Sequence, residues 1–339
     1  MTVRWGMVST SAIGRVVATA LAGSTEASLV AVAGRDGGKA AAYAAELGLP
    51  HSFGSYDELL ASDEIDAVYV PLPIALHSEW VVKALRAGKH VLCEKPFAPT
   101  AAEVVACFDA AEAADRLCIE GLMWRQHPQT RLAQRLVADG AIGSVALVRA
   151  TLAVSVDPGD IRRTGALGGG AVLDLGCYCV SAVRLFGGEP VSVSAAQVVD
   201  TAPGADGGDL RLAATLTLPG GALGQFDVAL DHPRRDELEI VGTGGKIVVT
   251  DPWLCRRGHL ELHRDGAVEH LTVDAPGLTE PGDDNDDAYR IEFENASLAI
   301  SSRATPLFGR ADAIAQATAL EAVRTAAVTG TPVHLRGPR

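Results

Sequence analysis

Short apolar runs alternate with helix-like stretches between Thr2 and Gly121. Each run is rich in strand-forming residues, and the stretch that separates it from the next has the spacing of an amphipathic helix. The runs lie at residues 2–8, 27–33, 51–53, 67–70, 91–94 and 117–121. Strands separated by helices predict a parallel sheet with right-handed crossovers. We therefore expect an α/β fold that begins with a doubly wound parallel sheet.

The chain length predicts two domains, because 339 residues exceed what one hydrophobic core usually organises. We place the first domain at residues 1–122 and the second at residues 123–339. From residue 144 onward, runs with a period of two residues and Gly-Gly turns predict a large, open, mostly antiparallel sheet. Helical patterns at 289–302 and 311–329 complete a second domain of α+β type.

Charge and composition exclude several classes of protein. The net charge of -13 argues against a nucleic-acid partner. We find no apolar run long enough to span a bilayer and no signal-peptide block at the start, so we expect a cytoplasmic protein without a membrane partner. The six cysteines lack metal-ligand spacing, which predicts buried apolar side chains and no metal site.

The first strand-like run leads into a turn of small residues and then into a helical pattern. This layout aims backbone N–H groups and a helix N-terminus at a pyrophosphate. The usual fingerprint is Gly-x-Gly-x-x-Gly, whereas this chain has Ser-x-Ser-x-x-Gly. Serine adds hydroxyl donors but lacks the freedom of glycine at positive φ. The expected cofactor contacts in this turn are Ser9, Thr10, Ser11, Ala12 and Ile13.

The second strand-like run ends in Gly34 and Arg35. An NAD site places an acidic side chain at this position to hold the ribose diol. An arginine instead suits a 2′-phosphate, which it can bind through charged hydrogen bonds. We therefore predict NADP as the cofactor, with Gly34, Arg35 and Lys39 near the phosphate. Asp36 could still reach the ribose and restore the use of NAD.

Lys95 follows the strand-like run at residues 91–94 and precedes Pro96. The proline keeps Lys95 out of the helical region, so the strand should end there in a loop. In an open parallel sheet such strand ends face the ligand crevice. A partly desolvated lysine suits proton transfer, so Lys95 is our first catalytic candidate.

Six blocks of the sequence together resemble the Gfo/Idh/MocA family of nicotinamide-dependent sugar oxidoreductases. The blocks lie at residues 5–14, 70–80 (VPLPIALHSEW), 91–96 (VLCEKP), 121–129 (GLMWRQHPQ), 140–143 and 168–178 (GGGAVLDLGCY). The ending Asp174-x-Gly176-x-Tyr178 is most similar to the group that includes D-xylose dehydrogenase, dimeric dihydrodiol dehydrogenase and glucose-fructose oxidoreductase.

The resemblance implies further contacts. Cofactor contacts are expected at Pro71, Leu72, His77, Glu94, Lys95, Trp124 and Arg125. Substrate contacts are expected at Lys95, His127, Arg162, Asp174 and Tyr178. The resemblance also implies a homodimer or homotetramer that forms through the open sheet.

Asp174 and Tyr178 are four residues apart in a stretch with a helical pattern, so they should lie on one face. We predict hydride transfer between nicotinamide and a carbinol or carbonyl carbon of a sugar or polyol. Lys95 would hydrogen-bond the reacting oxygen and favour the ionised form of Tyr178, the general base or acid, while Asp174 positions a neighbouring hydroxyl. The alternatives are a reductase of keto-sugars, which could be nucleotide-linked, and a non-catalytic NADP sensor of the same fold.

Overall fold

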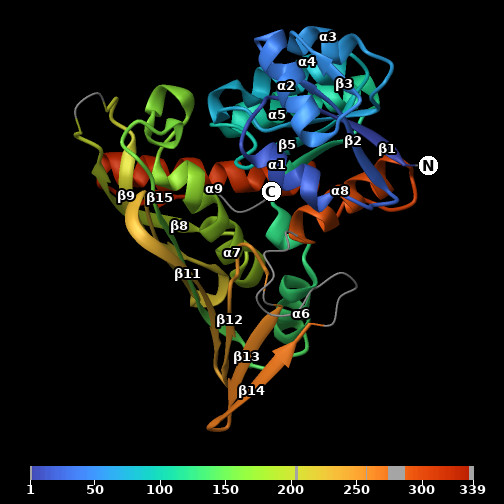
Figure 1. The fold of residues 1–339 in the computed structure, drawn as a ribbon. Helices are drawn as coiled ribbons and strands as arrows, with labels where there is room; N and C mark the ends of the chain where they lie inside the picture. The colour runs from blue at the N-terminus through green and yellow to red at the C-terminus, as the bar shows by residue number, and fades with distance from the viewer. Residues whose placement is uncertain (1, 203–204, 257, 274–286, 336–339) are drawn as a thin grey trace. The chain divides into compact units, whose positions relative to one another are not determined.

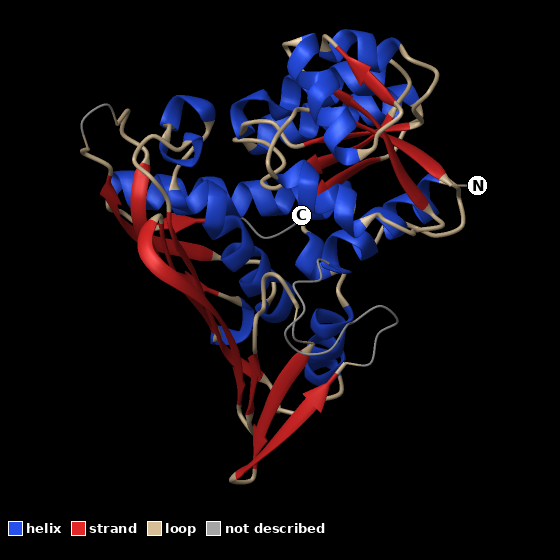
Figure 2. Cartoon of the chain, in the orientation of Figure 1, coloured by secondary structure: helices blue, strands red, loops and turns tan. Residues whose placement is uncertain are grey.

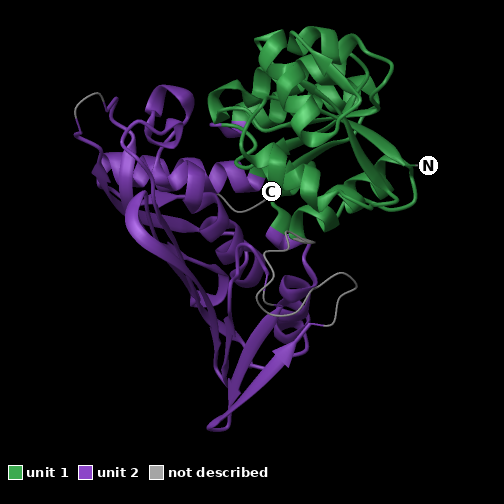
Figure 3. Cartoon of the chain, in the orientation of Figure 1, with its two compact units in different colours: residues 1–98, 102–123, 284–314 green, residues 99–101, 124–283, 315–339 purple. Residues whose placement is uncertain are grey.

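A computed structural model describes residues 2–202, 205–256, 258–273 and 287–335 of the chain. The chain divides into two compact units, and each has its own sheet (Figures 2 and 3). The first unit takes residues 1–98 and 102–123, together with the described residues of 284–314. The second takes the remaining described residues between 99 and 335. We had assigned everything from residue 123 onward to the second domain.

The first unit contains a six-stranded parallel sheet (Figure 1). Its strands are β1 (Val3–Val8), β2 (Ala27–Ala33), β3 (His51–Phe53), β4 (Ala67–Val70), β5 (His90–Glu94) and β6 (Cys118–Gly121). The strand order is β3-β2-β1-β4-β5-β6, so the chain adds strands on one side of β1 up to β3 and then on the other side from β4 onward. The boundary between β1 and β4 is the switch point of a doubly wound fold. This confirms the predicted fold class of the first part of the chain.

The helices between these strands follow the predicted alternation. They are α1 (Ile13–Ala20), α2 (Gly37–Leu47), α3 (Tyr56–Ala61), the short η1 (Ile74–Leu76), α4 (His77–Arg86) and α5 (Ala101–Ala114). Asp36 and Ser55 begin α2 and α3 as N-caps, since their side chains accept the backbone N–H groups of Lys39 and Glu58. Local sequence thus sets where the helices begin.

Helix α8 (Asp287–Ile300) also belongs to the first unit, although it comes late in the chain. The ring of Phe293 packs edge-on against Trp5 of β1 at 5.0 Å and against Tyr69 of β4 at 5.1 Å. The indole N–H of Trp5 donates to the Ser297 hydroxyl at 3.0 Å. These buried contacts explain why residues that we expected in the second domain complete the core of the first.

The second unit contains a nine-stranded sheet in the order β14-β13-β12-β11-β7-β10-β9-β8-β15. The strands are β7 (Val145–Ser155), β8 (Ser192–Val199), β9 (Asp209–Thr217), β10 (Leu223–Ala229), β11 (Asp231–Gly242), β12 (Lys246–Val249), β13 (His259–Arg264), β14 (Ala267–Thr272) and β15 (Val333–His334). Among the described strands of this second sheet, only the pair of β10 and β7 is parallel. The predicted mostly antiparallel sheet is confirmed, whereas β14 and β15 had not been predicted.

Among the helical elements of the second unit, one segment differs from our expectation about membrane-spanning runs. These elements are η2 (Met123–Arg125), α6 (Pro128–Ala138), η3 (Ile161–Arg163), η4 (Gly165–Leu167), η5 (Val172–Gly176), α7 (Cys177–Gly187), η6 (Pro219–Gly221) and α9 (Arg310–Thr329), which begins in the first unit. The segment Gly165–Gly187 is long and apolar enough to cross a membrane, contrary to our expectation. However, 78% of its apolar window is buried inside the protein, as in the core helix of a folded domain.

All six cysteines are free and buried, as predicted. Burial and the neighbouring thiols of Cys118 and Cys107 raise the pKa of Cys93 well above its ordinary value. The thiol beside Lys95 is therefore protonated at neutral pH and is not a nucleophile.

Candidate functional site

The turn after β1 is shaped to approach a ligand closely. Ser9 has φ of 149°, a conformation that glycine adopts far more readily than serine. Tyr43 of α2 donates its hydroxyl to the Ser11 carbonyl at 2.6 Å. A Cβ added at Gly14 would lie 2.4 Å from Met7 and 2.5 Å from the Tyr43 hydroxyl, so only glycine fits there. The turn is therefore held against the sheet at both ends.

These residues fit a bound dinucleotide. The Ser11 hydroxyl is buried and has no hydrogen-bond partner among the described residues, so it is free to donate to a phosphate. Ala12 and Ile13 form the start of α1, where unpaired backbone N–H groups favour an anion. A Cβ at Gly34 would be 3.4 Å from the Thr10 methyl group, so this turn also borders the end of β2.

The end of β2 favours a phosphate over a ribose diol. The Asp36 carboxylate accepts the backbone N–H of Lys39 at 2.9 Å, so the N-cap of α2 already uses it. Arg35 and Lys39 are exposed. Arg35 also lies within electrostatic reach of Tyr56, whose ring packs edge-on against Trp80 at 4.8 Å. The cations are thus available to a ligand, whereas one oxygen of the Asp36 carboxylate is already used by the N-cap.

His77 links two loops of the first unit. One ring nitrogen lies 2.8 Å from the Leu72 carbonyl, and the other lies 3.0 Å from the Pro96 carbonyl. Burial lowers the pKa of His77 below its ordinary value, despite these carbonyls. Each ring nitrogen faces a backbone carbonyl, and the neutral ring donates to one of the two, so the side chain links the loops at Pro71–Leu72 and after Lys95.

Carboxylates hold the turn that carries Lys95. Glu94 accepts the Lys95 backbone N–H at 3.2 Å with one oxygen and the Tyr69 hydroxyl at 2.6 Å with the other. Glu120, at the end of neighbouring β6, accepts the backbone N–H of Phe97 at 3.0 Å. The Lys95–Pro96 peptide bond is cis. The backbone on both sides of Lys95 is therefore tied to the ends of two strands.

In the second unit, Asp174 and Tyr178 stand on a distorted helix. We expected a regular α-helix from Asp174, but residues Val172–Gly176 form a π-turn and α7 begins at Cys177. Such single π-turns inside helices occur frequently at functional sites. The buried Tyr178 ring packs edge-on against Trp253 at 5.8 Å, and Trp253 packs in the same way against Trp124 at 5.4 Å. These indoles restrict the orientation of the Tyr178 ring.

Aspartates that we had not predicted fix the segment before this helix. Asp206 accepts the backbone N–H groups of Gly165 at 2.5 Å and Ala166 at 2.8 Å. Asp209 accepts the N–H of Val172 at 2.7 Å, and a Cβ at Gly170 would lie 2.3 Å from this carboxylate. The glycine run is tightly packed, and it is not the flexible approach that its composition suggests.

His127 begins α6 and is completely buried. Its Nδ1 accepts the Gln129 backbone N–H at 3.1 Å. Burial lowers the pKa of His127 to about 4, so the ring is neutral at pH 7 and Nε2 carries the proton. This N–H has no partner among the described residues, and the same holds for the indole N–H of Trp124. Both are buried donors without a hydrogen-bond partner in the described part of the chain.

The Arg162 side chain is paired with Asp160, the N-cap residue of its own short helix η3. The Arg125 side chain is buried. The Arg162 guanidinium donates to both oxygens of Asp160, at 3.0 and 2.7 Å. This pair raises the pKa of Arg162, and Asp174 contributes to the same shift. Arg162 and Asp174 therefore lie within electrostatic reach of each other, as a shared substrate site requires.

The predicted residues thus form two groups, each within one unit. The first group surrounds the carboxyl ends of β1, β2, β4 and β5, where open α/β sheets bind their ligands. The second group stands on η2, the N-cap of α6, η3, η5 and the start of α7. No group of three His, Cys, Asp or Glu side chains in the described parts of the chain could hold a metal ion.

This architecture defines a dinucleotide-binding oxidoreductase with a separate α+β unit. Two family models match the chain: "Oxidoreductase family, NAD-binding Rossmann fold" over residues 3–122, and "GFO/IDH/MocA C-terminal domain" over residues 130–248. The chain belongs to the GFO/IDH/MocA family of oxidoreductases, which confirms the resemblance seen in its motifs.

Relatives with named activities cover about three quarters or more of the chain. D-xylose 1-dehydrogenase (NADP(+)) 2 of Haloferax volcanii is 36% identical over 98% of this chain and 99% of its own length. A dTDP-3,4-didehydro-2,6-dideoxy-alpha-D-glucose 3-reductase of Saccharopolyspora spinosa is 35% identical over 74% of this chain and 76% of its own. A crystal structure of a 3-ketoreductase from Actinomadura kijaniata with NADP and TDP-benzene has a TM-score of 0.87 at 28% identity, covering 96% and 98% of the two chains.

We predict opposite effects of Ser9→Gly on stability and on cofactor affinity. Glycine relieves the positive φ, so the free energy of unfolding should rise by about 1 kcal/mol. Loss of the hydroxyl should weaken NADPH binding several-fold, on the scale of about 1 kcal/mol for one hydrogen bond. Denaturant unfolding and fluorescence titration measure the two quantities. Ser9→Ala, which keeps the strain, should lose affinity without gaining stability; a Ser9→Gly protein that binds NADPH as tightly as the wild type would contradict the role of the hydroxyl.

We predict that His127 makes the fold acid-sensitive. Because its pKa is about 4 in the folded chain, the unfolded chain binds a proton first as pH falls, and stability is lost below the ordinary histidine pKa. His127→Asn keeps an N-cap acceptor but does not titrate. Between pH 7 and pH 4 the wild type should lose roughly 3 kcal/mol more unfolding free energy than the variant. Equal losses in urea titrations at the two pH values would argue against a buried neutral ring.

Proposed function

We propose that the protein is an NADP-dependent oxidoreductase that transfers hydride between nicotinamide and a carbinol or carbonyl carbon of a sugar or related polyol. The observation that carries this proposal lies in the first unit. A phosphate-binding turn after β1 and a lysine turn after β5 stand at the same edge of one parallel sheet. The relationship to a D-xylose dehydrogenase over nearly the whole chain supports the same reading.

NADP is favoured over NAD by the end of β2. Arg35 and Lys39 are exposed cations, and Asp36 caps α2 instead of facing a ribose. A guanidinium binds a 2′-phosphate through two charged hydrogen bonds. The xylose dehydrogenase relative and the 3-ketoreductase structure are both described with NADP. NAD use would rely on the second carboxylate oxygen of Asp36 or on another group to take the ribose hydroxyls.

The residues of the chain would supply orientation and proton handling. When bound, the nicotinamide supplies the hydride acceptor or donor. Lys95 would donate a hydrogen bond to the reacting oxygen and favour the ionised form of Tyr178. Tyr178 would take the hydroxyl proton in oxidation and return it in reduction. Asp174 would accept a hydrogen bond from a neighbouring hydroxyl of the substrate.

The substrate side fits a polyhydroxylated molecule. His127 offers a neutral N–H donor, and Asp174 an acceptor within electrostatic reach of Arg162. Such mixed donors and acceptors discriminate sugars by their hydroxyl pattern, because an unmatched buried polar group is costly. The family relationship favours an aldose, oxidised at a carbinol carbon.

A keto-sugar reductase is the second candidate. It is supported by the relative from Saccharopolyspora spinosa and by the structural similarity to the 3-ketoreductase. Steady-state rates with aldoses, inositols, trans-dihydrodiols and free or nucleotide-linked keto-sugars separate the two. Oxidation of aldoses supports the first function, and reduction confined to keto-sugars supports the second. No turnover with any of them, combined with tight NADPH binding, would point to a sensor.

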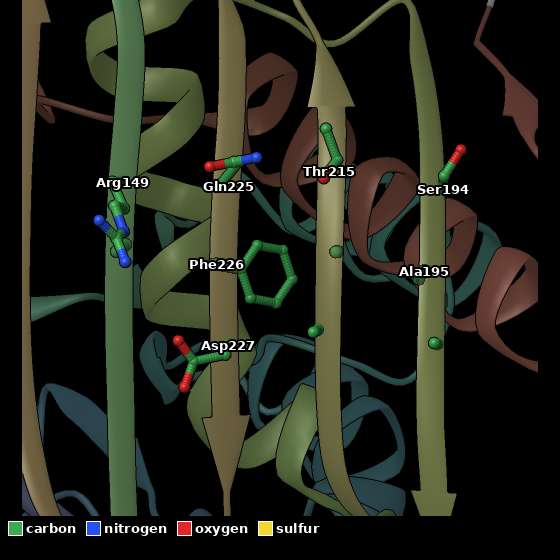
Figure 4. A pocket seen from close by; sticks show the side chains of 11 residues that line it. Arg149, Ser194, Ala195, Thr215, Gln225, Phe226 and Asp227 are labelled. Carbon is green, nitrogen blue, oxygen red and sulfur yellow. The ribbon is translucent and has the colours of Figure 1, made fainter.

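We also propose that a second copy of the chain covers the open face of the large sheet and that the protein acts in the cytoplasm. Arg149, Gln225, Thr215 and Ser194 form one row across β7, β10, β9 and β8 (Figure 4). Beside them lie small alanines, with exposed Val198 and Leu223 near the ends of their strands. A flat face with a few exposed apolar side chains suits a symmetric partner. Sedimentation as a monomer would contradict this association.

Tyr178→Phe should reduce turnover at least about a hundredfold, since it removes the group that exchanges the proton. Steady-state kinetics with the best substrate of the panel measures this effect. NADPH affinity should stay within about twofold of the wild type, which controls for misfolding. Unchanged turnover would remove Tyr178 from the mechanism.

Arg35→Ala should weaken NADPH binding about 10- to 100-fold and leave NADH binding nearly unchanged, because only NADPH carries the 2′-phosphate. Fluorescence titration with both nucleotides gives the ratio. Arg264→Ala, which removes an exposed arginine of β13, is the matched control. An equal loss for both nucleotides would show that the cofactor assignment is wrong.

A further inference from the structure

A third carboxyl group lies within electrostatic reach of Glu94 and Glu120, the two that bind the backbone of the lysine turn. Glu292 of α8 is completely buried, with none of its surface exposed to solvent. Neither of its side-chain oxygens has a hydrogen-bond partner among the described residues. An ionised carboxylate without donors is very unfavourable in a protein interior. This position therefore requires a physical explanation.

The neighbours of Glu292 come from three strands and from its own helix. Glu94 of β5 and Glu120 of β6 lie within electrostatic reach of Glu292. Tyr69 of β4 lies within electrostatic reach of both Glu94 and Glu292. On α8, Tyr289 is one turn away, and the adjacent Phe293 packs against the Tyr69 ring. Among these groups Glu94 and Glu120 are carboxyl groups, and both raise the pKa of Glu292.

The same neighbours differ from Glu292 in how they are satisfied. Glu94 accepts two hydrogen bonds and Glu120 accepts the N–H of Phe97, and such donors stabilise an ionised carboxylate. Glu292 has burial and two negative neighbours but no such donor. Burial first, and Glu94 and Glu120 next, raise its pKa well above the ordinary value for glutamate. Of the three carboxyl groups, Glu292 is therefore the one in which neither oxygen accepts a hydrogen bond among the described residues.

We propose that Glu292 is a neutral carboxylic acid in the working protein and that its neutrality positions Lys95. A neutral Glu292 lets Glu94 and Glu120 both keep the charges with which they bind the backbone of Lys95 and Phe97. Ionisation of Glu292 would place three negative charges in one dry region and loosen this turn. Glu292 is a positioning residue, since it acts through Glu94 and Glu120. The inference rests on the proposed function, in which Lys95 contacts the reacting oxygen.

The direction of the pH effect follows from this arrangement. The folded chain keeps the Glu292 proton at pH values at which the unfolded chain has released it. Stability is therefore lost as pH rises above the ordinary glutamate pKa. Glu292→Gln supplies a neutral side chain of the same shape at every pH. Its unfolding free energy should fall less steeply with rising pH than that of the wild type.

The experiment compares the wild type, Glu292→Gln and the control Glu294→Gln, all as full chains. Glu294 is on the same helix, is partly exposed and accepts the Ser24 hydroxyl at 2.8 Å. Infrared spectra at neutral pH should contain a protonated-carboxyl C=O band that is lost only in Glu292→Gln. Turnover at pH 7 should stay within about twofold of the wild type in both variants. On the alkaline side, turnover should decline at a higher pH in Glu292→Gln than in the other two proteins.

Two results would overturn the inference. One is the absence of a protonated-carboxyl band specific to Glu292, which would mean that the group is ionised. The other is superimposable pH profiles of turnover in all three proteins, which would leave Glu292 without influence on Lys95. The infrared and unfolding measurements need no substrate. A positive band in a protein that turns over no sugar would therefore contradict the proposed function while leaving the protonation of Glu292 intact.

Discussion

The structure depends on the way in which two strand-end carboxylates bind the backbone around Lys95. Parallel strands bring their carboxyl ends to one edge, so β5 and β6 can each carry, at or next to the last residue, a glutamate whose side chain reaches the same loop. Tyr69 of β4 fixes the second oxygen of Glu94. A lysine on an untethered loop would sample many positions, whereas preorganised groups hold a reacting oxygen with little loss of entropy.

In the second unit, hydrogen bonds to the backbone and ring packing likewise support Tyr178. Asp206 and Asp209 bind backbone N–H groups before and at the start of the π-turn, and the indole of Trp253, which packs against Trp124, packs against the phenol ring. In both units a candidate side chain is supported by acceptors or rings from elements distant in the sequence. The family relationship explains why such supports occur in one chain, because transfer of hydride and proton demands fixed geometry of the reacting groups.

Sequence reasoning predicted what local pattern determines. The period of apolar residues located β1 to β6 and most of the large sheet, and motif resemblance identified the family. It did not predict that α8 joins the first unit, because Phe293 and Ser297 meet Trp5 and Tyr69 only through tertiary packing. It also missed the π-turn, whose apolar spacing differs little from that of an α-helix. Glu292 looked like any solvated helix glutamate, since burial cannot be read from a single charged residue.

Transfer of deuterium tests the central claim most directly. The protein is incubated with NADP⁺ and D-xylose or another aldose deuterated at the carbinol carbon that reacts, and the reduced nucleotide is analysed by mass spectrometry. The account predicts one deuterium in each NADPH formed, in a reaction that Tyr178→Phe slows without displacing the label. NADPH that forms without deuterium, or the absence of any reduced nucleotide across the aldoses and polyols, would contradict it.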